Sequence, residues 1–551
     1  MRNRVISSFG FLAVLAVGLG SSGGLRAAAD EPIGRLHWLG KAKLAGESNA
    51  AALVATWKLP ESQALEAEAL DKFALALASG LQSQASSLQP QAATNFLRPL
   101  LADLVRAESY VEMRQSGGQA AEAVLAVRLD AQHAARWETD VAAILQGCGA
   151  TAGAPAQNGA RCWQWPKNDG TGASRAVCLD RAGDWTLLSL GPNPSPEPSA
   201  FSQLVARIRR EKAPFPARAT NYWLEADADL ARLLPALGCA WRPETGLPKA
   251  TLSAIGDGAW VHSSALLTFP EPLPLRLDPW LVPTNLITNV VSGFTAARGF
   301  APWLASLGAW QRLQVGPPPS QFFWWDCPSS PVASSFAALQ PEASNQIARL
   351  TDRVLEASRS WPIIGPKLAF AKSPRTGTLV WTGLPFIDLS LKPVATQAAT
   401  YLFGNFFHMA GTNSGLPPEL LQELLSRTNL AAYGWEVTAQ RCLDWYVVGQ
   451  ALRYVAERHQ FPPTAATTWI RYVGGKFGPA ATEVVQTRPE QLSIKRTSAV
   501  GFTGLELHLL VEWLESPQFP RGFYSLLVKA PEPEPPRPLA PATPPASARK
   551  P

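Results

Sequence analysis

The sequence predicts an α+β fold of repeated strand–helix–hairpin modules with mostly antiparallel sheets. Three observations support this class. Short runs rich in aromatic and β-branched residues, typical of strands, alternate with amphipathic helical patterns. Turns containing glycine or proline join neighbouring strands closely enough to form hairpins. A chain of 551 residues with 46% hydrophobic composition is long enough to bury several cores.

Helices are predicted where apolar residues recur every three or four positions. The patterns over residues 61–78, 344–359 and 504–515 are the clearest, and Pro517 ends the last of them. In the first helix the apolar residues fall on one face: Leu65, Ala69, Phe73 and Leu77.

Hairpins are predicted where two strand-like runs flank a turn. The turn signals Ser116-Gly117-Gly118 and Asn168-Asp169-Gly170 each separate such runs. The paired runs are residues 109–114 with 121–129, 162–166 with 176–179 and then 185–190, 259–269 with 273–277, and 378–381 with 386–391.

A strand that leads directly into a helix recurs along the chain. The copies cover residues 51–57, 123–129, 221–227, 321–326 and 430–437. The last four are spaced by about 100 residues, which is typical of repeated domains with their own cores. We therefore expect an N-terminal α+β segment and four α+β modules, over residues 30–120, 121–218, 219–318, 319–427 and 428–529. One larger α+β domain with a cleft is the alternative.

Residues 1–29 have the pattern of a secretory signal peptide. Arg2 and Arg4 precede an uncharged apolar stretch, and Ala27-Ala28-Ala29 provides small residues for cleavage before Asp30. The apolar stretch is short for a membrane span, which needs roughly 20 residues. We expect a periplasmic or secreted protein that contacts a membrane only if this segment stays uncleaved as an anchor.

The C-terminal segment, residues 530–551, contains nine prolines and little apolar bulk. This composition predicts a disordered, polyproline-leaning tail. Such a tail serves as a spacer, as a ligand for a partner, or as a flexible terminus without a role of its own.

The formal charge of +6 is spread thinly along the chain. Arg207, Arg209, Arg210 and Lys212 form the densest basic cluster, but apolar residues at helical spacing lie among them. The pattern therefore predicts that the cluster is the exposed side of an amphipathic helix, and nucleic-acid binding is not expected.

Six cysteines in an exported chain permit disulfides. Cys148, Cys162 and Cys178 lie close together in the sequence, and we expect one bridge between two of these three. The spacing does not select the pair. Cys239, Cys327 and Cys442 are far apart and are expected to be small buried residues.

No catalytic residue, cofactor site or metal site is predicted. The dinucleotide-like pattern Gly18–Gly23 and the nucleophile-like pattern Gly20–Gly24 both fall inside the signal peptide. The six histidines do not pair at metal-ligand spacing. Glu225, Asp227 and Asp229 alternate at a strand-to-helix boundary, where acids commonly cap and stabilise a helix start.

Trp324 and Trp325 follow Phe322-Phe323 in a predicted strand. Neighbours in a strand face opposite ways, so one aromatic pair would be exposed if only one face of the sheet is covered. Exposed aromatics bind sugar rings or proteins, whereas a strand covered on both faces would bury them in a core.

The segment Gly34–Lys41, with Ser48-Asn49 and Leu59–Ser62, resembles exported proteins of unknown function from environmental bacteria. The late segments Thr503–Leu507 and Trp513–Pro517 fit the same resemblance. It implies export and a shared architecture, and it implies no functional residues.

Together these patterns favour an exported, non-catalytic binding or structural protein of the cell envelope. Its partner is unknown, with an envelope protein or a polysaccharide as candidates. The alternatives are a hydrolase with a dispersed site in a cleft between modules, and a carbohydrate-binding protein that uses exposed tryptophans.

Overall fold

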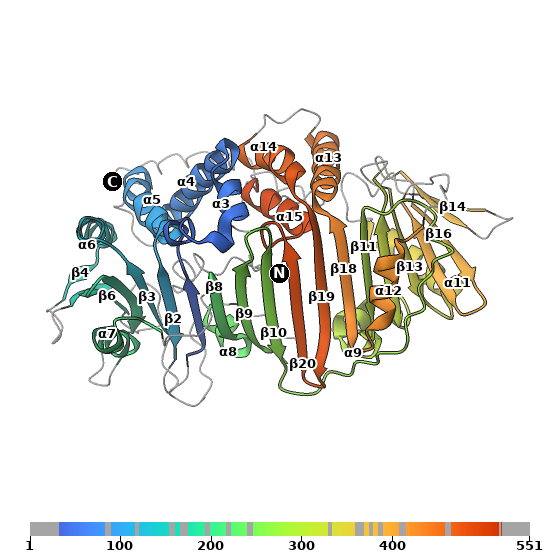
Figure 1. Cartoon of the computed structure of the whole chain (residues 1–551), viewed down its shortest axis with the longest axis horizontal. Helices are drawn as coiled ribbons and strands as arrows, with labels where there is room; N and C mark the ends of the chain where they lie inside the picture. Colours follow the sequence, from blue (N-terminus) through green and yellow to red (C-terminus); the bar gives the residue numbers. More distant parts are fainter. Residues whose placement is uncertain are drawn as a thin grey trace, which may run out of the picture.

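The computed structural model describes residues 32–520, except for 83–89, 116–120, 154–159, 166–174, 193–198, 216–221, 238, 240–245, 329–332, 359–368, 374–377, 384–388, 407–414, 458–463 and 517–518. The predicted signal peptide and proline-rich tail lie outside the described residues. Within them, the chain forms one long antiparallel sheet with helices on both faces (Figure 1). The α+β class is confirmed.

The strands are β1 (Gly34–Trp38), β2 (Ser109–Arg114), β3 (Glu122–Arg128), β4 (Thr151–Ala152), β5 (Arg161–Trp165), β6 (Arg175–Ala182), β7 (Trp185–Pro192), β8 (Leu224–Asp229), β9 (Lys249–Gly256), β10 (Val261–Thr268), β11 (Gly293–Arg298), β12 (Gln321–Asp326), β13 (Ser334–Leu339), β14 (Ala369–Lys372), β15 (Leu379–Thr382), β16 (Leu389–Ala395), β17 (Thr400–Asn405), β18 (Leu430–Val437), β19 (Pro479–Arg488) and β20 (Gln491–Ser498).

The helices are α2 (Lys41–Leu44), α3 (Ala51–Trp57), α4 (Pro60–Gln82), α5 (Pro90–Arg106), α6 (Ala131–Gly147), α7 (Ala200–Glu211), α8 (Leu230–Ala236), α9 (Ala301–Ser306), α10 (Gly308–Leu313), α11 (Ala343–Ser358), α12 (Pro418–Ser426), α13 (Thr438–Glu457), α14 (Ala465–Tyr472) and α15 (Gly504–Leu514).

The strand pairings give one linear order: β4-β5-β6-β7-β3-β2-β1-β8-β9-β10-β20-β19-β18-β11-β12-β13-β17-β16-β15-β14. The order of β1–β10 from one edge equals that of β11–β20 from the other. The two halves meet at β10 and β20, where Val261 pairs with Ser498 and Thr268 with Gln491. This arrangement is what an approximate two-fold axis between β10 and β20 requires.

The four strands that were predicted to open equivalent modules do not occupy four equivalent places. β3 lies between β2 and β7, whereas β12 lies between β11 and β13. Only β8 and β18 correspond, because they follow α7 and α12 and pair with the first strand of their halves. The pairings favour two ten-stranded halves over four modules of about 100 residues.

The first copy of the predicted strand pattern, Ala51–Trp57, is wrong. These residues form helix α3, with Val54 buried. Seven apolar residues fit either structure by periodicity, and alanine is the best helix former. Residues 273–277 form no strand either, since Pro270, Pro272 and Pro274 lack the donors that a sheet needs.

The predicted hairpin strands at β2–β3, β5–β6–β7 and β15–β16 do pair, and the three clearest predicted helices correspond to α4, α11 and α15. The two glycine-containing turns lie outside the described residues. Among those described, none of the helices combines the length and apolarity that crossing a bilayer would require.

The two faces of the first half carry different cores. On one face, here called the α6 face, helices α4, α5 and α6 pack on Leu125, Val127 and Leu179. On the opposite α7 face, helix α7 packs on Val124 and Leu187. This alternation follows from the two-residue period of strand side chains.

Helix α4 also ties the first half to the last helices of the chain. Trp469 of α14 donates from its indole nitrogen to Ser62 Oγ at 2.9 Å, and Lys72 donates to the Leu514 carbonyl at 2.9 Å. Phe73 packs against Trp513 with ring centroids 5.6 Å apart. The N-terminal helices therefore stabilise the C-terminal half as well as their own.

Candidate functional site

A buried histidine lies between carboxylates in the middle of the first half. His37 is 6% exposed on β1, where it pairs with Tyr110 on one side and Glu225 on the other. Its Nε2 is 3.2 Å from Glu108 Oε1, and its Nδ1 is 3.7 Å from Glu225 Oε2. The ring of Phe215 covers it at 3.8 Å between centroids.

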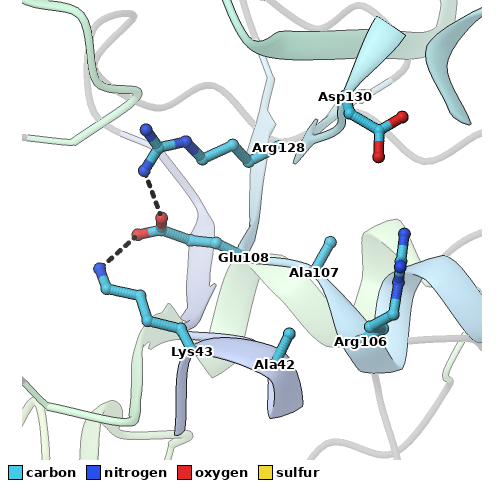
Figure 2. Close-up of a pocket in the computed structure, with 7 residues that line it drawn as sticks. All are labelled: Ala42, Lys43, Arg106, Ala107, Glu108, Arg128 and Asp130. Carbon is cyan, nitrogen blue, oxygen red and sulfur yellow. Dashed lines mark hydrogen bonds and ion pairs between the residues drawn. The ribbon is translucent and has the colours of Figure 1, made fainter. Parts of the chain in front are cut away.

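Glu108 connects this buried histidine to a surface pocket. Lys43 of α2 and Arg128 of β3 approach its carboxylate from opposite sides, with nitrogen–oxygen distances of 3.8 and 3.5 Å (Figure 2). Burial raises the pKa of Glu108, but the hydrogen bond from His37 and the positive charges of Lys43 and Arg128 outweigh it and lower the pKa below its ordinary value. Glu108 is therefore ionised at neutral pH.

The pocket has a volume of about 240 Å³. Figure 2 shows Ala107 between Glu108 and Arg106, with Asp130 across the pocket from Arg106. Three cationic and two carboxylate side chains contribute to the lining, which contains no serine, threonine or cysteine: Ala42, Lys43, Arg106, Ala107, Glu108, Arg128 and Asp130. Such a lining suits binding of a charged group and offers no hydroxyl or thiol nucleophile.

Hydrogen bonds within the protein hold Asp103, beside Arg106, and Asp130 in place. Asp103 accepts a hydrogen bond from the Trp137 indole at 3.1 Å and lies 3.4 Å from Arg106. Asp130 caps helix α6 by accepting from the His133 backbone at 2.9 Å. Hydrogen bonds from the His133 backbone and ring lower the pKa of Asp130 below its ordinary value.

An apolar cavity of about 170 Å³ lies between α4, α5 and α6 and the α6 face of the sheet. Apart from Gly80 and Ser189, every residue that lines it is apolar: Leu77, Leu81, Leu97, Leu100, Leu101, Leu104, Val111, Ala123, Val124, Leu125, Trp137, Val141, Ile144, Leu145, Trp165, Val177, Leu188 and Leu190. A cavity of this kind disfavours ordered water, because a water needs two to four polar partners and the lining offers almost none.

Two long helices make this cavity. α4 and α5 connect β1 to β2 and cover the sheet together with α6. At the equivalent place in the second half, between β11 and β12, the chain forms only the short helices α9 and α10. The space is therefore a feature of the first half and not a consequence of the repeated sheet.

The cavity and the charged pocket are lined by different residues of the same elements. Leu104, Leu125 and Trp137 face the cavity, whereas Arg106, Arg128 and Asp130 line the pocket. On β3 the separation of Leu125 from Arg128 corresponds to about 10 Å at the ordinary rise of a strand.

A cluster of polar side chains, Asp257, His262 and Thr497, lies where the two halves of the sheet meet. His262 of β10 contacts Asp257 Oδ2 through Nε2 at 2.7 Å and Thr497 Oγ1 through Nδ1 at 3.1 Å. The His262 and Asp257 side chains are 43% and 47% exposed. Hydrogen bonds from His262 and from the Trp260 and Ala259 backbone lower the pKa of Asp257 to about 2.

Two of the three cysteines in the predicted group form a disulfide, and the third is a free thiol. Cys162 and Cys178 are cross-strand partners on β5 and β6 and form a disulfide with a Cα–Cα distance of 4.1 Å. Cys148 is a free, buried thiol at the end of α6, and burial raises its pKa to about 11.

Trp325 is 2% exposed and packs in the core of the second half, so it does not contribute to an exposed aromatic surface. Trp324 faces the other way. Its ring stacks on Phe336 at 6.1 Å between centroids, and its indole donates to Asp326 at 3.0 Å. Cross-strand packing of this kind explains both residues without a ligand.

The three alternating acids have separate roles. Asp229 caps helix α8, as expected of an acid at a helix start. Asp227 forms an ion pair with Arg35 at 2.6 Å. Glu225 instead faces His37, which sequence spacing did not indicate. His408 lies outside the described residues, and among those described no group of three His, Cys, Asp or Glu side chains is placed to hold a metal ion.

Sequence comparison gives no match to a family model or to a curated protein. A solved structure described as "Structure of crystal form I of TP0453" aligns with 43% of this chain and 99% of its own, at 10% identity and a TM-score of 0.21. At that score the alignment carries no argument about fold or function.

Proposed function

We propose that this is an exported, non-catalytic binding protein of the cell envelope that holds an apolar ligand in the cavity beneath α4, α5 and α6. The observation that carries the proposal is the almost entirely apolar lining of that cavity. Small-molecule sites are typically concave, mostly apolar and largely preformed.

The size of the cavity limits the ligand. An engineered apolar cavity of about 150 Å³ stays dry and binds benzene, so a space of about 170 Å³ takes a ring or a short alkyl segment. Several lining residues are only partly buried, among them Leu81, Leu97 and Leu190.

Asp257, His262 and Thr497 support a second candidate, a hydrolase with its site at the junction of the halves. A carboxylate that orients an imidazole beside a hydroxyl is the arrangement of an activated nucleophile. We rank it second because His262 and Asp257 are nearly half exposed, and solvent weakens such activation. Thr497→Ala tests this candidate: hydrolysis of a panel of p-nitrophenyl esters that disappears in the variant would establish it.

The proposal is tested by isothermal calorimetry of the purified protein, with toluene, a single apolar ring that fits the cavity, as the probe. We expect saturable binding to the wild-type protein. Ala123→Phe places a ring in the cavity from β3 and should weaken binding at least tenfold, since the ring and the probe compete for one volume.

The matched control is Ala135→Phe, the same change on the exposed side of α6. It should leave probe affinity within about twofold of wild type, because surface substitutions away from the cavity change little. Equal probe binding by all three folded proteins would contradict a cavity site.

Export has its own test: mass spectrometry of the mature protein should give an N-terminus at Asp30, and an intact Met1 would contradict cleavage.

A further inference from the structure

We propose that the charged pocket binds a small oxyanion, of the phosphate class, between Lys43, Arg106 and Arg128. This site is separate from the apolar cavity, and neither proposal depends on the other.

The three cations are not engaged in short ion pairs. Lys43 and Arg128 lie 3.8 and 3.5 Å from Glu108, Arg128 also lies 3.3 Å from Asp184, and Arg106 lies 3.4 Å from Asp103. A charge-assisted hydrogen bond between nitrogen and oxygen is typically about 2.7–2.9 Å long. These long contacts leave room for an anion to take up donors that the protein carboxylates use weakly.

The cations are also accessible while the central carboxylate is not. The side chains of Lys43, Arg106 and Arg128 are 45%, 50% and 51% exposed, whereas that of Glu108 is 8% exposed. Glu108 also accepts from His37 on its buried side. Glu108 therefore holds two of the cations, and about half of each cationic side chain remains exposed to solvent.

The internal repeat supplies a comparison within the same molecule. Ser109 is the first residue of β2 and pairs with Trp38, the last residue of β1. Gln321 occupies the same place in the second half, because it is the first residue of β12 and pairs with Arg298, the last residue of β11. Ser109 also pairs with Val127. Counting back along the chain from Ser109 and Gln321 by one residue, Glu108 corresponds to Ser320. Counting back by three residues, Arg106 corresponds to Pro318.

The same register sets the end of β3 against the end of β13. Phe322 pairs with Ala338, so the residue opposite Gln321 is Leu339 and the residue that follows it, Gln340, corresponds to Arg128. Asp130 and Glu342 each precede the first residue of the next helix, α6 or α11, which supports the correspondence.

The second half closes this place with neutral side chains. Gln340 is 2% exposed and donates to the Pro317 carbonyl at 2.8 Å, and Gln346 donates to the same carbonyl at 3.0 Å. The repeated fold is thus built without a guanidinium group at the positions of Arg106 and Arg128, where the second half has Pro318 and Gln340. The charges of Arg106 and Arg128 are an addition of the first half, which favours a binding role over a structural one.

A tetrahedral oxyanion matches this set, because guanidinium groups donate to two phosphate oxygens at once and an ammonium adds a point charge. Free phosphate and the headgroup of an anionic phospholipid share that chemistry. Both are accessible to an exported protein.

The test uses the full-length protein in two arms. In the first, inorganic phosphate is titrated by isothermal calorimetry at low salt. In the second, the protein is floated with phosphatidylcholine vesicles that contain or lack phosphatidylglycerol. We expect saturable binding in at least one arm, and the arm that responds identifies the source of the oxyanion.

Arg128→Gln introduces the residue type that the second half has at the equivalent position, and Arg106→Gln removes the second guanidinium. Each should weaken binding about tenfold or more, since a hydrogen bond to a charged group contributes that much. Arg98→Gln is the control, because Arg98 is on the same helix as Arg106, is 44% exposed and also faces an acid, Asp71. Its affinity should stay within twofold.

Two outcomes would overturn the proposal. One is that the wild-type protein binds neither phosphate nor anionic vesicles. The other is an equal loss of binding in Arg98→Gln, which would indicate attraction by net charge instead of a defined pocket.

Discussion

Trp137 and Asp103 connect the two sites of the first half. The indole ring lines the apolar cavity, and its Nε1 donates to Asp103 at 3.1 Å. Asp103 in turn lies 3.4 Å from Arg106, a residue of the charged pocket. Both Trp137 and Asp103 are almost completely buried, at 2% and 4% exposed. One buried hydrogen bond therefore fixes the end of the cavity that is nearest to the charges.

Removing this bond should destabilise the protein. Trp137→Phe keeps a ring in the cavity wall but leaves the buried carboxylate of Asp103 with one donor fewer, at a cost of about 1–3 kcal/mol. Urea unfolding measures the loss. A double-mutant cycle with Asp103→Asn should show coupling above about 0.5 kcal/mol. Additive effects would mean that the two side chains do not interact in solution.

Enlarging the cavity should lower the stability of the protein and increase the stabilisation that a bound ligand provides. Ile144→Ala removes apolar wall on α6 and should reduce the free energy of unfolding by about 2–5 kcal/mol. The same variant should gain more stabilisation than wild type from a saturating bulky apolar ligand, because the ligand fills the added space. Thermal melts with and without naphthalene provide the comparison. A ligand shift no larger than in wild type would place binding elsewhere.

The buried acid Asp444 of α13 predicts a pH dependence of stability. Burial raises its pKa to about 6, against which a hydrogen bond from Gln440 and the charge of Arg441 act weakly. The folded state therefore favours the protonated acid. The contribution of Asp444 to stability is full below its ordinary pKa, falls as pH rises from about 4 to 6, and stays low above 6.

Asp444→Asn should remove this decline. A shift of about two pKa units corresponds to up to about 3 kcal/mol, so the variant should be more stable than wild type at pH 7.5 and similar at pH 4. Urea unfolding at both pH values tests this, with the exposed Asp352→Asn as control. A variant that is less stable than wild type at pH 7.5 would show that the Asp444 carboxylate interacts favourably after all.

The cysteines predict a simple pattern of reactivity. Cys162 and Cys178 should appear as one bridged peptide in non-reducing mapping, and reduction should cost on the order of 3 kcal/mol by releasing a loop of this size. In the native state, iodoacetamide should label Cys239 before the buried Cys148, Cys327 and Cys442. Free thiols at Cys162 and Cys178 in protein from an oxidising compartment would contradict the bridge.

Local patterns predicted the elements better than their arrangement. The helix over residues 61–78 has a long apolar stripe and forms as expected, as α4. Ala51–Trp57 was misassigned because its length fits either a strand or a helix turn. The sequence spacing predicts a repeat of about 100 residues, whereas the pairing of β10 with β20 joins strands that are far apart in the sequence. Single-sequence spacing does not encode that register.

The candidate sites were beyond sequence reasoning for the same reason. Lys43, Glu108 and Arg128 come from separate elements, and only the sheet brings them together. The hydrogen bond between His37 and Glu108 spans 71 positions. The apolar cavity gives no local signal either, since a leucine that lines a cavity and one that fills a core follow the same helical period. In contrast, the acid at Asp229 was interpreted correctly because capping is a local interaction.

The most direct test of the central claim locates a small apolar ligand by NMR. Protein labelled at isoleucine, leucine and valine methyls is mixed with cyclohexane, and nuclear Overhauser contacts between ligand and methyl groups are recorded. The account predicts contacts to Val141, Ile144 and Leu188, which line the cavity, and none to Ile255 or Ile494 on the central strands. Contacts to the central strands alone, or no contacts at saturating ligand, would contradict it.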